Sequence, residues 1–539
     1  MDWNTHEPSN LATELQDYNL YTTDLALQEG VRRAGGAAHE AELTAYGALL
    51  GSAATIRMAE LANHVKPELH TFDRQGRRID RVEFHPAWHG MMRMARESGM
   101  ITQPFSDGRP GAWAAYAAAF SMHHQVEAGS QCPNSMTLAS VPVLRQDPEL
   151  FAALAPKLFS RTYDGRDLPL EAKDSILVGM GMTEKQGGSD LRSNTTRAVA
   201  VDGGYEITGH KWFFSAPMCD AHLVLARAEA GLSCFFVPRY RPDGSKNAVH
   251  IQRLKEKVGN RSNSSSEVEF HSAWGRLIGQ EGRGIATIIE MANYTRLNCV
   301  MGAASLMRQC VAQAIDHTRQ RHAFGKRLVD QPLMRNVLAD MALESEAATQ
   351  LMMRMTEAFD RDDSPLERAY QRIVTPAGKL WTTKRSIELS AEAMEVFGGN
   401  GYMDEGPMGR LYRETPVLSI WEGSGNVMAL DMLRAIAREP EAMAALLTDL
   451  EQGCHADALL RPHLAALASM LGGADETLAR RQGQLLVTLI QARLLRERAP
   501  AVVADAFIAS RFDHQHGRIY GTLADASGHG AIIERAFPA

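Results

Sequence analysis

One segment of this chain combines small, polar and acidic residues in a pattern that could hold a flat polar ligand. Residues 181–193 read GMTEKQGGSDLRS and contain the hydroxyls of Thr183 and Ser189 together with the pair Gly187-Gly188. Because glycine leaves the approach open, backbone N–H groups and short hydroxyls of such a loop can lie along a planar polar ring. An ordinary Gly-Gly turn is the alternative interpretation of this segment alone.

Two further side chains could carry charge to a ligand or take a proton from it. Arg321 lies in RHAFG, and an arginine presents a rigid fork that matches phosphate oxygens. Glu422 follows Trp421 in SIWEGSGN, and a carboxylate can act as a general base when desolvation raises its pKa. Each residue taken singly has an alternative interpretation. Arg321 could be a solvated cation at a helix end, and Glu422 could have the structural role of orienting its loop and no role as a base.

The order of these segments along the chain is more specific than any one of them. After residues 181–193 come WFFS at 212–215, RHAFG at 321–325, EVFGGNGYMDE at 395–405 and SIWEGSGN at 419–426. In this order they resemble the acyl-CoA dehydrogenase family of FAD flavoproteins over residues 175–437. FHPAWH at 84–89, VEAGSQCP at 126–133 and the length of the C-terminal tail are similar to the AidB branch, which is linked to DNA alkylation damage.

The resemblance implies an oxidoreductase acting on the CH–CH bond of an acyl-CoA ester, with Glu422 as the base that removes the α-proton. The other family position for this base precedes an arginine on the first bundle helix. Here that dipeptide is Thr295-Arg296, so the alternative base is absent and Arg296 is a candidate substrate contact. The cofactor-binding residues implied are Met182, Thr183, Gly188, Ser189, Trp212, Phe214, Ser215, Arg321, Phe324, Gln331, Gly398, Gly399, Trp421, Ser424 and Asn426. For WFFS alone, a buried strand with aromatic packing is the competing interpretation.

The hydrophobic pattern predicts the elements that must position these residues. Residues 1–174 are Ala-rich with apolar positions at helical spacing, whereas 175–283 show short alternating runs broken by turns. Helical spacing returns in four long segments over 284–438 and again over 439–539. We therefore predict an α+β protein with an N-terminal helical domain, a middle β-barrel or sandwich, a four-helix bundle and an extra C-terminal helical domain. The methionines at 341, 352, 353 and 355 are interpreted as core residues.

The composition limits the other function classes. No apolar stretch is long enough for a transmembrane helix, and the N-terminus lacks the pattern of a signal peptide. The six cysteines show no CxxC spacing, which indicates reduced thiols in a cytoplasmic protein and no metal site. The net charge of −7 means that any nucleic-acid contact must come from a local patch.

The C-terminal tail is where the resemblance implies contact with double-stranded DNA. Residues 440–539 contain nine arginines, no lysine and eleven acidic residues, which is a poor footprint for phosphate binding. The arginines cluster at 480, 481, 493, 496 and 498 around an apolar core. Arg493, Arg496 and Arg498 are the candidate DNA contacts, and structural salt bridges are the alternative.

Three functions follow from this pattern as hypotheses. The first is a DNA-associated flavoprotein that protects against alkylation and has weak dehydrogenase chemistry. The second is a metabolic dehydrogenase of short- or branched-chain acyl-CoA that passes electrons to an electron-transfer flavoprotein. The third is a non-enzymatic DNA-associated scaffold. The resemblance also implies a homotetramer in which Arg321 and the glycine run reach the FAD of a neighbouring subunit.

Overall fold

The computed structural model describes residues 5–361, 364–471, 475–513 and 517–539. The chain is mainly helical with one large sheet, which confirms the predicted α+β class. It divides into two compact units. The sheet unit comprises residues 54–108 and 126–298, and the helical unit comprises residues up to 53, 109–125 and 299–539. No helix among the described residues is long and apolar enough to cross a membrane.

The large sheet of the sheet unit closes on itself as a small barrel. Strand β6 pairs with β4, β4 with β5, β5 with β9, β9 with β7, and β7 again with β6. Buried apolar side chains such as Ile207, Phe214, Phe235 and Phe270 form its core. All its strands lie inside the predicted range 175–283. They are β3 (Val178–Gly181), β4 (Arg197–Val201), β5 (Gly204–Phe214), β6 (Ala221–Ala228), β7 (Gly231–Pro238), β8 (Val249–Leu254) and β9 (Ser266–Ile278).

A second, two-stranded hairpin lies in the region that the sequence predicts as helical. Strands β1 (Glu68–Phe72) and β2 (Arg78–Glu83) pair antiparallel. The Asp73 carboxylate accepts hydrogen bonds from the N–H groups of Gln75 and Arg77 and so fixes the turn. The helices of this unit are α3 (Ala53–His64), α4 (Pro86–Glu97), α5 (Gln103–Ser106), α7 (Gln131–Leu144), α8 (Pro148–Leu158) and the first part of α9 (Gly284–Gln320).

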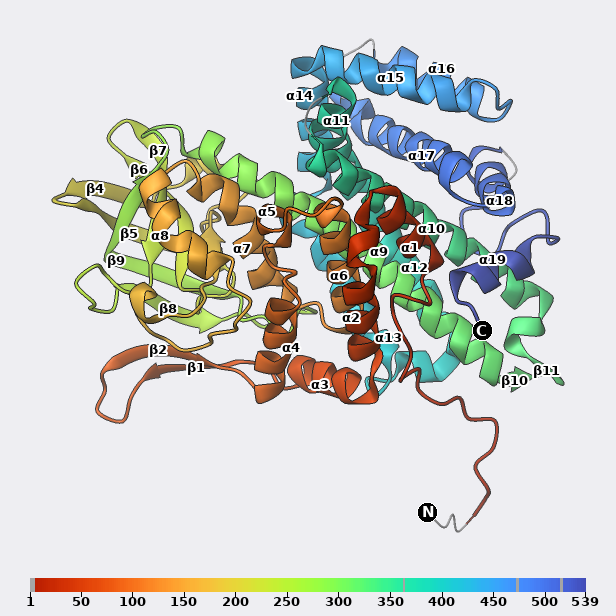
Figure 1. Cartoon of the computed structure of the whole chain (residues 1–539), viewed down its shortest axis with the longest axis horizontal. Coiled ribbons are helices and arrows are strands. Elements are labelled where there is room, and N and C mark those ends of the chain that lie inside the picture. Colours follow the sequence, from red (N-terminus) through yellow and green to blue (C-terminus); the bar gives the residue numbers. More distant parts are fainter. Residues whose placement is uncertain (1–4, 362–363, 472–474, 514–516) are drawn as a thin grey trace. The chain divides into compact units, whose positions relative to one another are not determined.

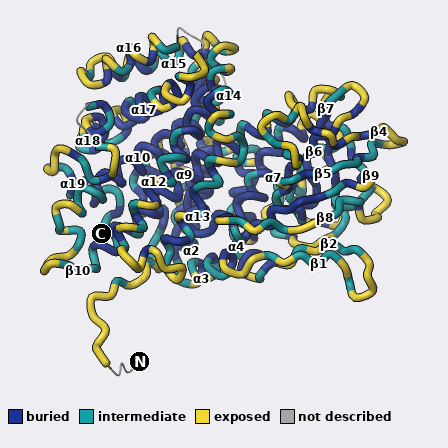
Figure 2. The backbone as a smooth tube through the Cα atoms, turned by 180° about the vertical axis from the view of Figure 1, so that it is seen from behind, coloured by how far each residue is buried: buried dark blue, intermediate teal, exposed yellow. Residues whose placement is uncertain are grey.

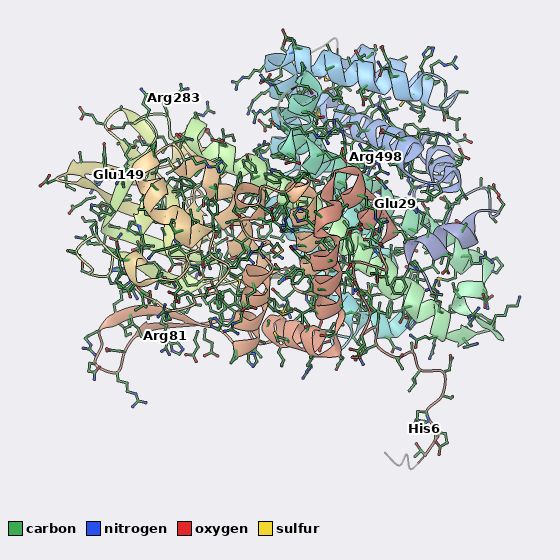
Figure 3. All side chains as sticks on the ribbon, in the orientation of Figure 1. His6, Glu29, Arg81, Glu149, Arg283 and Arg498 are labelled. Atoms are coloured by element: carbon green, nitrogen blue, oxygen red, sulfur yellow. The ribbon has the colours of Figure 1, made fainter. Side chains whose placement is uncertain are left out.

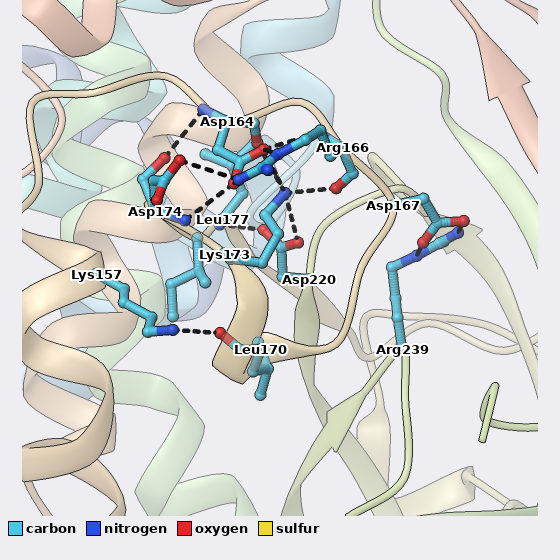
Figure 4. A network of polar contacts seen from close by, with 12 residues as sticks. Lys157, Asp164, Arg166, Asp167, Leu170, Lys173, Asp174, Leu177, Asp220 and Arg239 are labelled. Carbon is cyan, nitrogen blue, oxygen red and sulfur yellow. Dashed lines mark hydrogen bonds and ion pairs between the residues drawn. The ribbon is translucent and has the colours of Figure 1, made fainter. Parts of the chain in front are cut away.

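The segment between α8 and β3 is fixed by a polar network (Figure 4). Buried Lys173 lies 3.1 Å from a carboxylate oxygen of Asp220 and donates to the carbonyls of Asp164 and Arg166. Asp220 in turn accepts the N–H of Leu177 at 2.8 Å. The network therefore fixes the start of β3, the strand that leads directly into the 181–193 loop.

The helical unit is built around long helices with buried inner faces (Figures 1 and 2). Helix α10 contacts α1, α12, α17 and α19, and its four clustered methionines are buried, which confirms them as core residues. Helix α11 continues through a π-helical turn at residues 370–374 into α12. The main helices are α1 (Leu25–Arg33), α2 (Glu40–Gly51), α6 (Ala112–Val126), the second part of α9, α10 (Pro332–Asp360), α11 (Pro365–Ala369), α12 (Thr375–Val396), α13 (Pro407–Ile420) and α14 (Gly425–Arg438).

The C-terminal tail belongs to the same unit as the bundle. Helix α17 packs on α10, α12 and α14, while α15 and α16 lie on α17. Arg535 on α19 bonds to Glu29 on α1, labelled in Figure 3, and to Glu346 on α10. Five α-helices make up the described tail: α15 (Pro440–Cys454), α16 (Leu460–Leu471), α17 (Ala479–Arg498), α18 (Ala501–Phe512) and α19 (His529–Ala536).

Candidate functional site

The predicted site residues are divided between the two units. The residues from Met182 to Ser215 and Arg296 belong to the sheet unit. The residues from Arg321 onward, which include Glu422 and the tail arginines, belong to the helical unit. Each unit therefore holds its own part of the predicted site.

In the sheet unit, the loop after β3 is organised around a buried acid that the sequence did not single out. Glu184 pairs with buried Lys211 of β5 at 2.8 Å. Its carboxylate also accepts the N–H groups of Thr195 and Thr196 at 2.7 and 3.1 Å. Buried Asn194 donates to the carbonyl of Met182 at 2.8 Å. These bonds hold the loop at both ends. The signal in the sequence that could have revealed this anchor is Glu184 in the loop together with Lys211 near the end of the next long strand, β5.

The charges of this pair are set by burial and by each other. Burial alone would raise the pKa of Glu184, but the Lys211 ammonium and the loop hydrogen bonds hold that pKa well below its usual range. Burial lowers the pKa of Lys211 to about 8, against the opposing effect of Glu184. Removing either partner would leave a buried charge without compensation.

The glycine pair makes the turn of this loop possible. Gly187 has φ of 145°, which side-chain-bearing residues rarely adopt. A Cβ on Gly188 would lie 2.4 Å from the hydroxyl oxygen of Thr183, so the residue must be glycine for this close approach. Thr183 and Gly188 therefore lie close together, and Ser189 next to them is exposed.

The end of β5 presents a different aromatic from the one predicted. Phe214 is 1% exposed and stacks on His222, so its side chain belongs to the core of the barrel. Phe213, which was not predicted, is 53% exposed. A shift of register between Lys211 and Phe214 changes the alternation of the strand, so Phe214 is buried and Phe213 is exposed. Trp212 remains beside the loop, because its backbone N–H donates to the carbonyl of Thr183 at 2.8 Å.

In the helical unit, Arg321 begins a short hairpin at the end of α9. Strands β10 (His322–Ala323) and β11 (Lys326–Arg327) flank the turn Phe324-Gly325, in which both residues have positive φ. Phe324 is 99% exposed. Positive φ is rare for a bulky residue and persists where the surrounding structure fixes it. The Gln331 side chain donates to the carbonyl of Ala323 at 2.9 Å, so it supports the hairpin.

The glycine run lies next to the base of this hairpin. The ring of His317, one turn before Arg321, stacks on Phe397, which precedes Gly398, at 4.1 Å between centroids. Burial, followed by the charge of Arg321, lowers the pKa of His317. Apart from the adjacent residues of the chain, no described residue comes within 4 Å of a Cβ built on Gly398 or Gly399. The backbone there is open to a ligand.

Glu422 occupies a strained turn between α13 and α14. Its φ is 59°, outside the usual region for a residue with a side chain. Buried Lys379 donates to the carbonyl of Gly423 at 2.7 Å and so holds the turn; this residue was not predicted either. Ser424 precedes α14 without using its hydroxyl as a cap, and the Asn426 side chain accepts a bond from Arg480 at 3.3 Å.

The described residues fit a flavin nucleotide at three points. The indole N–H of Trp421 is buried and has no partner among them. Arg321 has no carboxylate partner in the described part of the chain, so its charge is available to a pyrophosphate. The open backbone at Gly398 and Gly399 permits close approach of such a group.

The remaining candidates lie in different surroundings. Arg296 is buried on α9, within the sheet unit. Arg498, labelled in Figure 3, donates to both carboxylate oxygens of Glu357 at 2.8 and 3.1 Å. Arg493 pairs with Asp449 and Glu497, and Arg496 pairs with Asp457 and Asp505. All three candidate DNA contacts are thus neutralised within the chain.

Known protein families match most of the chain. Sequence profiles described as Adaptive response protein AidB N-terminal domain, Acyl-CoA dehydrogenase middle domain and Acyl-CoA dehydrogenase C-terminal domain match residues 10–165, 179–273 and 282–437. The putative acyl-CoA dehydrogenase AidB of Escherichia coli (strain K12) is 50% identical over 442 residues, which are 81% of this chain and 82% of that protein.

Two solved structures share the fold. ACDH-11 of Caenorhabditis elegans in complex with C11-CoA has a TM-score of 0.85 at 24% identity, covering 99% of this chain and 94% of that one. An acyl-CoA dehydrogenase of Bacillus anthracis complexed with FAD has a TM-score of 0.63 at 18% identity, covering 84% and 81%. The chain belongs to the acyl-CoA dehydrogenase family, whose members are FAD flavoproteins that oxidise a CH–CH bond of acyl-CoA esters, and within that family it is similar to AidB.

Proposed function

We propose that this protein oxidises an acyl-CoA ester with Glu422 as the base that removes the α-proton. The observation that carries the proposal is the strained turn of Glu422, which Lys379 holds at the carbonyl of the next residue. Strain of this kind persists only where the surrounding structure fixes it, and it is concentrated at functional sites. When bound, FAD supplies the acceptor for the hydride that leaves Cβ.

The chain's own residues divide the remaining tasks. Glu422 takes the proton from Cα as the hydride leaves Cβ, so that a C=C bond forms and the charge balances. The Thr183 and Ser189 hydroxyls and the backbone of Gly188 bind the polar edge of the flavin, with Phe213 and Ser215 beside it. Arg321, Gly398 and Gly399 receive the pyrophosphate. Trp421 gives its unpartnered indole N–H to the bound ligand.

The exposed hairpin of Arg321 supports a proposal about assembly. Phe324 at its tip is fully exposed in a strained conformation, which favours insertion into a second copy of this chain. We therefore propose a homo-oligomer, a homotetramer by resemblance, in which Arg321 and Gly398 of one copy complete the flavin site of another. An electron-transfer flavoprotein is the proposed acceptor of the electrons.

The experiment that tests the enzymatic proposal is an anaerobic titration of the FAD-loaded protein with acyl-CoA esters of several chain lengths. We expect bleaching of the flavin absorbance with at least one ester. Glu422→Gln keeps FAD but slows bleaching by about 100- to 10,000-fold, because an amide cannot accept the proton. Equal rates would exclude Glu422 as the base, and no bleaching in the unmodified protein would favour the scaffold hypothesis.

A role in the response to DNA alkylation is the second candidate function. It is favoured by the match of residues 10–165 to the adaptive response profile. Among the described tail residues, Arg480 and Arg481 are exposed and have no carboxylate partner, unlike Arg493, Arg496 and Arg498. We therefore propose Arg480 and Arg481 as the phosphate contacts of any DNA complex. A salt-dependent shift of a DNA duplex by the full-length protein tests this.

A further inference from the structure

The N-terminal segment before α1 is bonded directly to the hairpin that carries Arg321. The side-chain amide of Asn10 donates to the carbonyl of His322 at 2.8 Å and accepts the N–H of the same residue at 2.7 Å. The guanidinium of Arg321 donates through Nη1 to the backbone carbonyl of Asn10. One residue near the start of the chain thus contacts both the backbone of the hairpin and the arginine proposed to bind the flavin pyrophosphate.

The conformation of Asn10 is adapted to these contacts. Its φ is 55°, in the left-handed region that asparagine tolerates better than most residues. In this conformation the amide reproduces the donor and acceptor pair that a neighbouring strand would offer to His322. A second contact lies just beyond it, because the N–H and hydroxyl of Thr13 both donate to the Gln320 side chain, at 2.8 and 2.9 Å.

The contact orients Arg321 without pairing it with a carboxylate. Its partner is a neutral carbonyl, and no carboxylate of the described residues pairs with it. A guanidinium has five N–H donors, so one bond to a carbonyl leaves the rest for phosphate oxygens. A free arginine on the surface loses much rotamer freedom when it binds a phosphate, and a side chain that is already held loses less.

We propose that Asn10 is a positioning residue that orients Arg321 for the flavin pyrophosphate, so that the N-terminal segment controls FAD affinity. This inference rests on the proposed role of Arg321. It makes the first residues of the AidB-like domain part of the cofactor site without any contact to the cofactor itself.

The test is a double-mutant cycle on full-length apoprotein titrated with FAD, with flavin fluorescence as the readout. Asn10→Gly removes the two side-chain bonds to His322 that hold the backbone carbonyl of residue 10 beside Arg321, while glycine keeps the left-handed backbone accessible. We expect it to raise the Kd for FAD about tenfold in the unmodified protein and to leave the Kd unchanged in an Arg321→Ala background. Asn10→Gly should also reduce the dependence of the Kd on ionic strength. We expect the same of Arg321→Ala, because the first variant moves the Arg321 guanidinium away from the pyrophosphate and the second removes it. The matched control is Thr13→Val. It removes the hydroxyl that bonds to the Gln320 side chain, a contact of the same segment that does not reach residues 321 and 322, and it should bind FAD normally.

The outcomes separate this inference from the function on which it rests. If Arg321→Ala leaves FAD binding unchanged, the proposed role of Arg321 fails. The inference is overturned if Arg321→Ala weakens FAD binding but Asn10→Gly does not. It is also overturned if Asn10→Gly weakens binding equally in the unmodified protein and in the Arg321→Ala background, because Asn10 then does not act through Arg321. Asn10→Asp, which retains the acceptor for the His322 N–H and adds a carboxylate next to Arg321, should also weaken FAD binding and serves if the glycine variant does not fold.

Discussion

The hairpin of Arg321 and helix α17 are both rich in arginine, and sequence alone suggests anion binding for both. The structure distinguishes them. Arg321 donates to a neutral carbonyl and lies near a glycine backbone that no described atom covers. On α17, Arg493, Arg496 and Arg498 each bond to carboxylates of the same chain. The partner of an arginine, and not its presence, therefore indicates whether it can receive a ligand.

The largest expected effect is on stability, and it should occur only on α17. Arg498→Ala leaves the carboxylate of Glu357, whose side chain is only 11% exposed, without its partner, and breaking a buried pair typically costs about 3–5 kcal/mol. Arg321→Ala should change the free energy of unfolding by less than about 1 kcal/mol, because its side chain supports no buried charge. Urea denaturation of the apoproteins measures both. Equal stability of the two variants would remove the distinction between the regions.

The next effect is on the cofactor, and it should occur only at the hairpin. Arg321→Ala loses charged hydrogen bonds worth about 1.5–3 kcal/mol, which corresponds to FAD affinity about 10- to 100-fold weaker. Arg327→Ala is the matched control on the same hairpin, because Arg327 is bonded to Asp330 at 2.8 Å and should not matter for FAD. Titration of the apoproteins with FAD measures the Kd. A weaker affinity in the control variant alone would refute the assignment of Arg321.

A smaller effect is expected in DNA binding. If the protein binds a duplex, the double variant Arg480→Ala/Arg481→Ala should lower the slope of log affinity against log salt by about 1.8, or 0.9 per phosphate contact. Arg493→Ala/Arg496→Ala should leave the slope unchanged, because these side chains are already neutralised. Fluorescence anisotropy of a labelled duplex over a salt series measures the slopes. The opposite result would return the DNA contact to Arg493 and Arg496.

The smallest effect is the response of the α17 contacts to acid. Burial raises the pKa of Asp457, but hydrogen bonds from Arg496 and from backbone N–H groups outweigh it and lower that pKa below its usual value. A carboxylate with a lowered pKa stabilises the fold above its unfolded pKa and loses this contribution as pH falls through its folded value. We expect a loss of under about 1 kcal/mol below about pH 4, because Arg496 is partly exposed. The urea midpoint of unfolding is measured from about pH 5 to about pH 3 for the unmodified protein and for Asp457→Asn. As the pH falls, the midpoint should decrease less steeply for Asp457→Asn, and the same decrease in both proteins would contradict this prediction.

The sequence was sufficient for the family and the fold class, because these depend on short local patterns. It was not sufficient for the partners of the tail arginines. Arg498 bonds to Glu357, which is 141 residues away in sequence, and Arg493 bonds to Asp449, which is 44 residues away. Phe214 was chosen from its position in the family motif, and its burial beside an exposed Phe213 depends on a shift of strand register that the sequence does not show. Glu184 lies within the 181–193 motif, but only its contacts with Lys211 and the loop backbone identify it as the anchor.

The most direct test of the central claim, that Glu422 is the base of a flavin-dependent oxidation, is exchange of the α-proton of a bound acyl-CoA ester. The FAD-loaded protein is incubated anaerobically in D₂O with the ester that bleaches the flavin, and deuterium at Cα is followed by mass spectrometry. We predict that the unmodified protein incorporates deuterium and that Glu422→Gln, with its FAD retained, does so at least about 100-fold more slowly. Incorporation at the same rate in both proteins would show that another group removes the proton and would contradict the account.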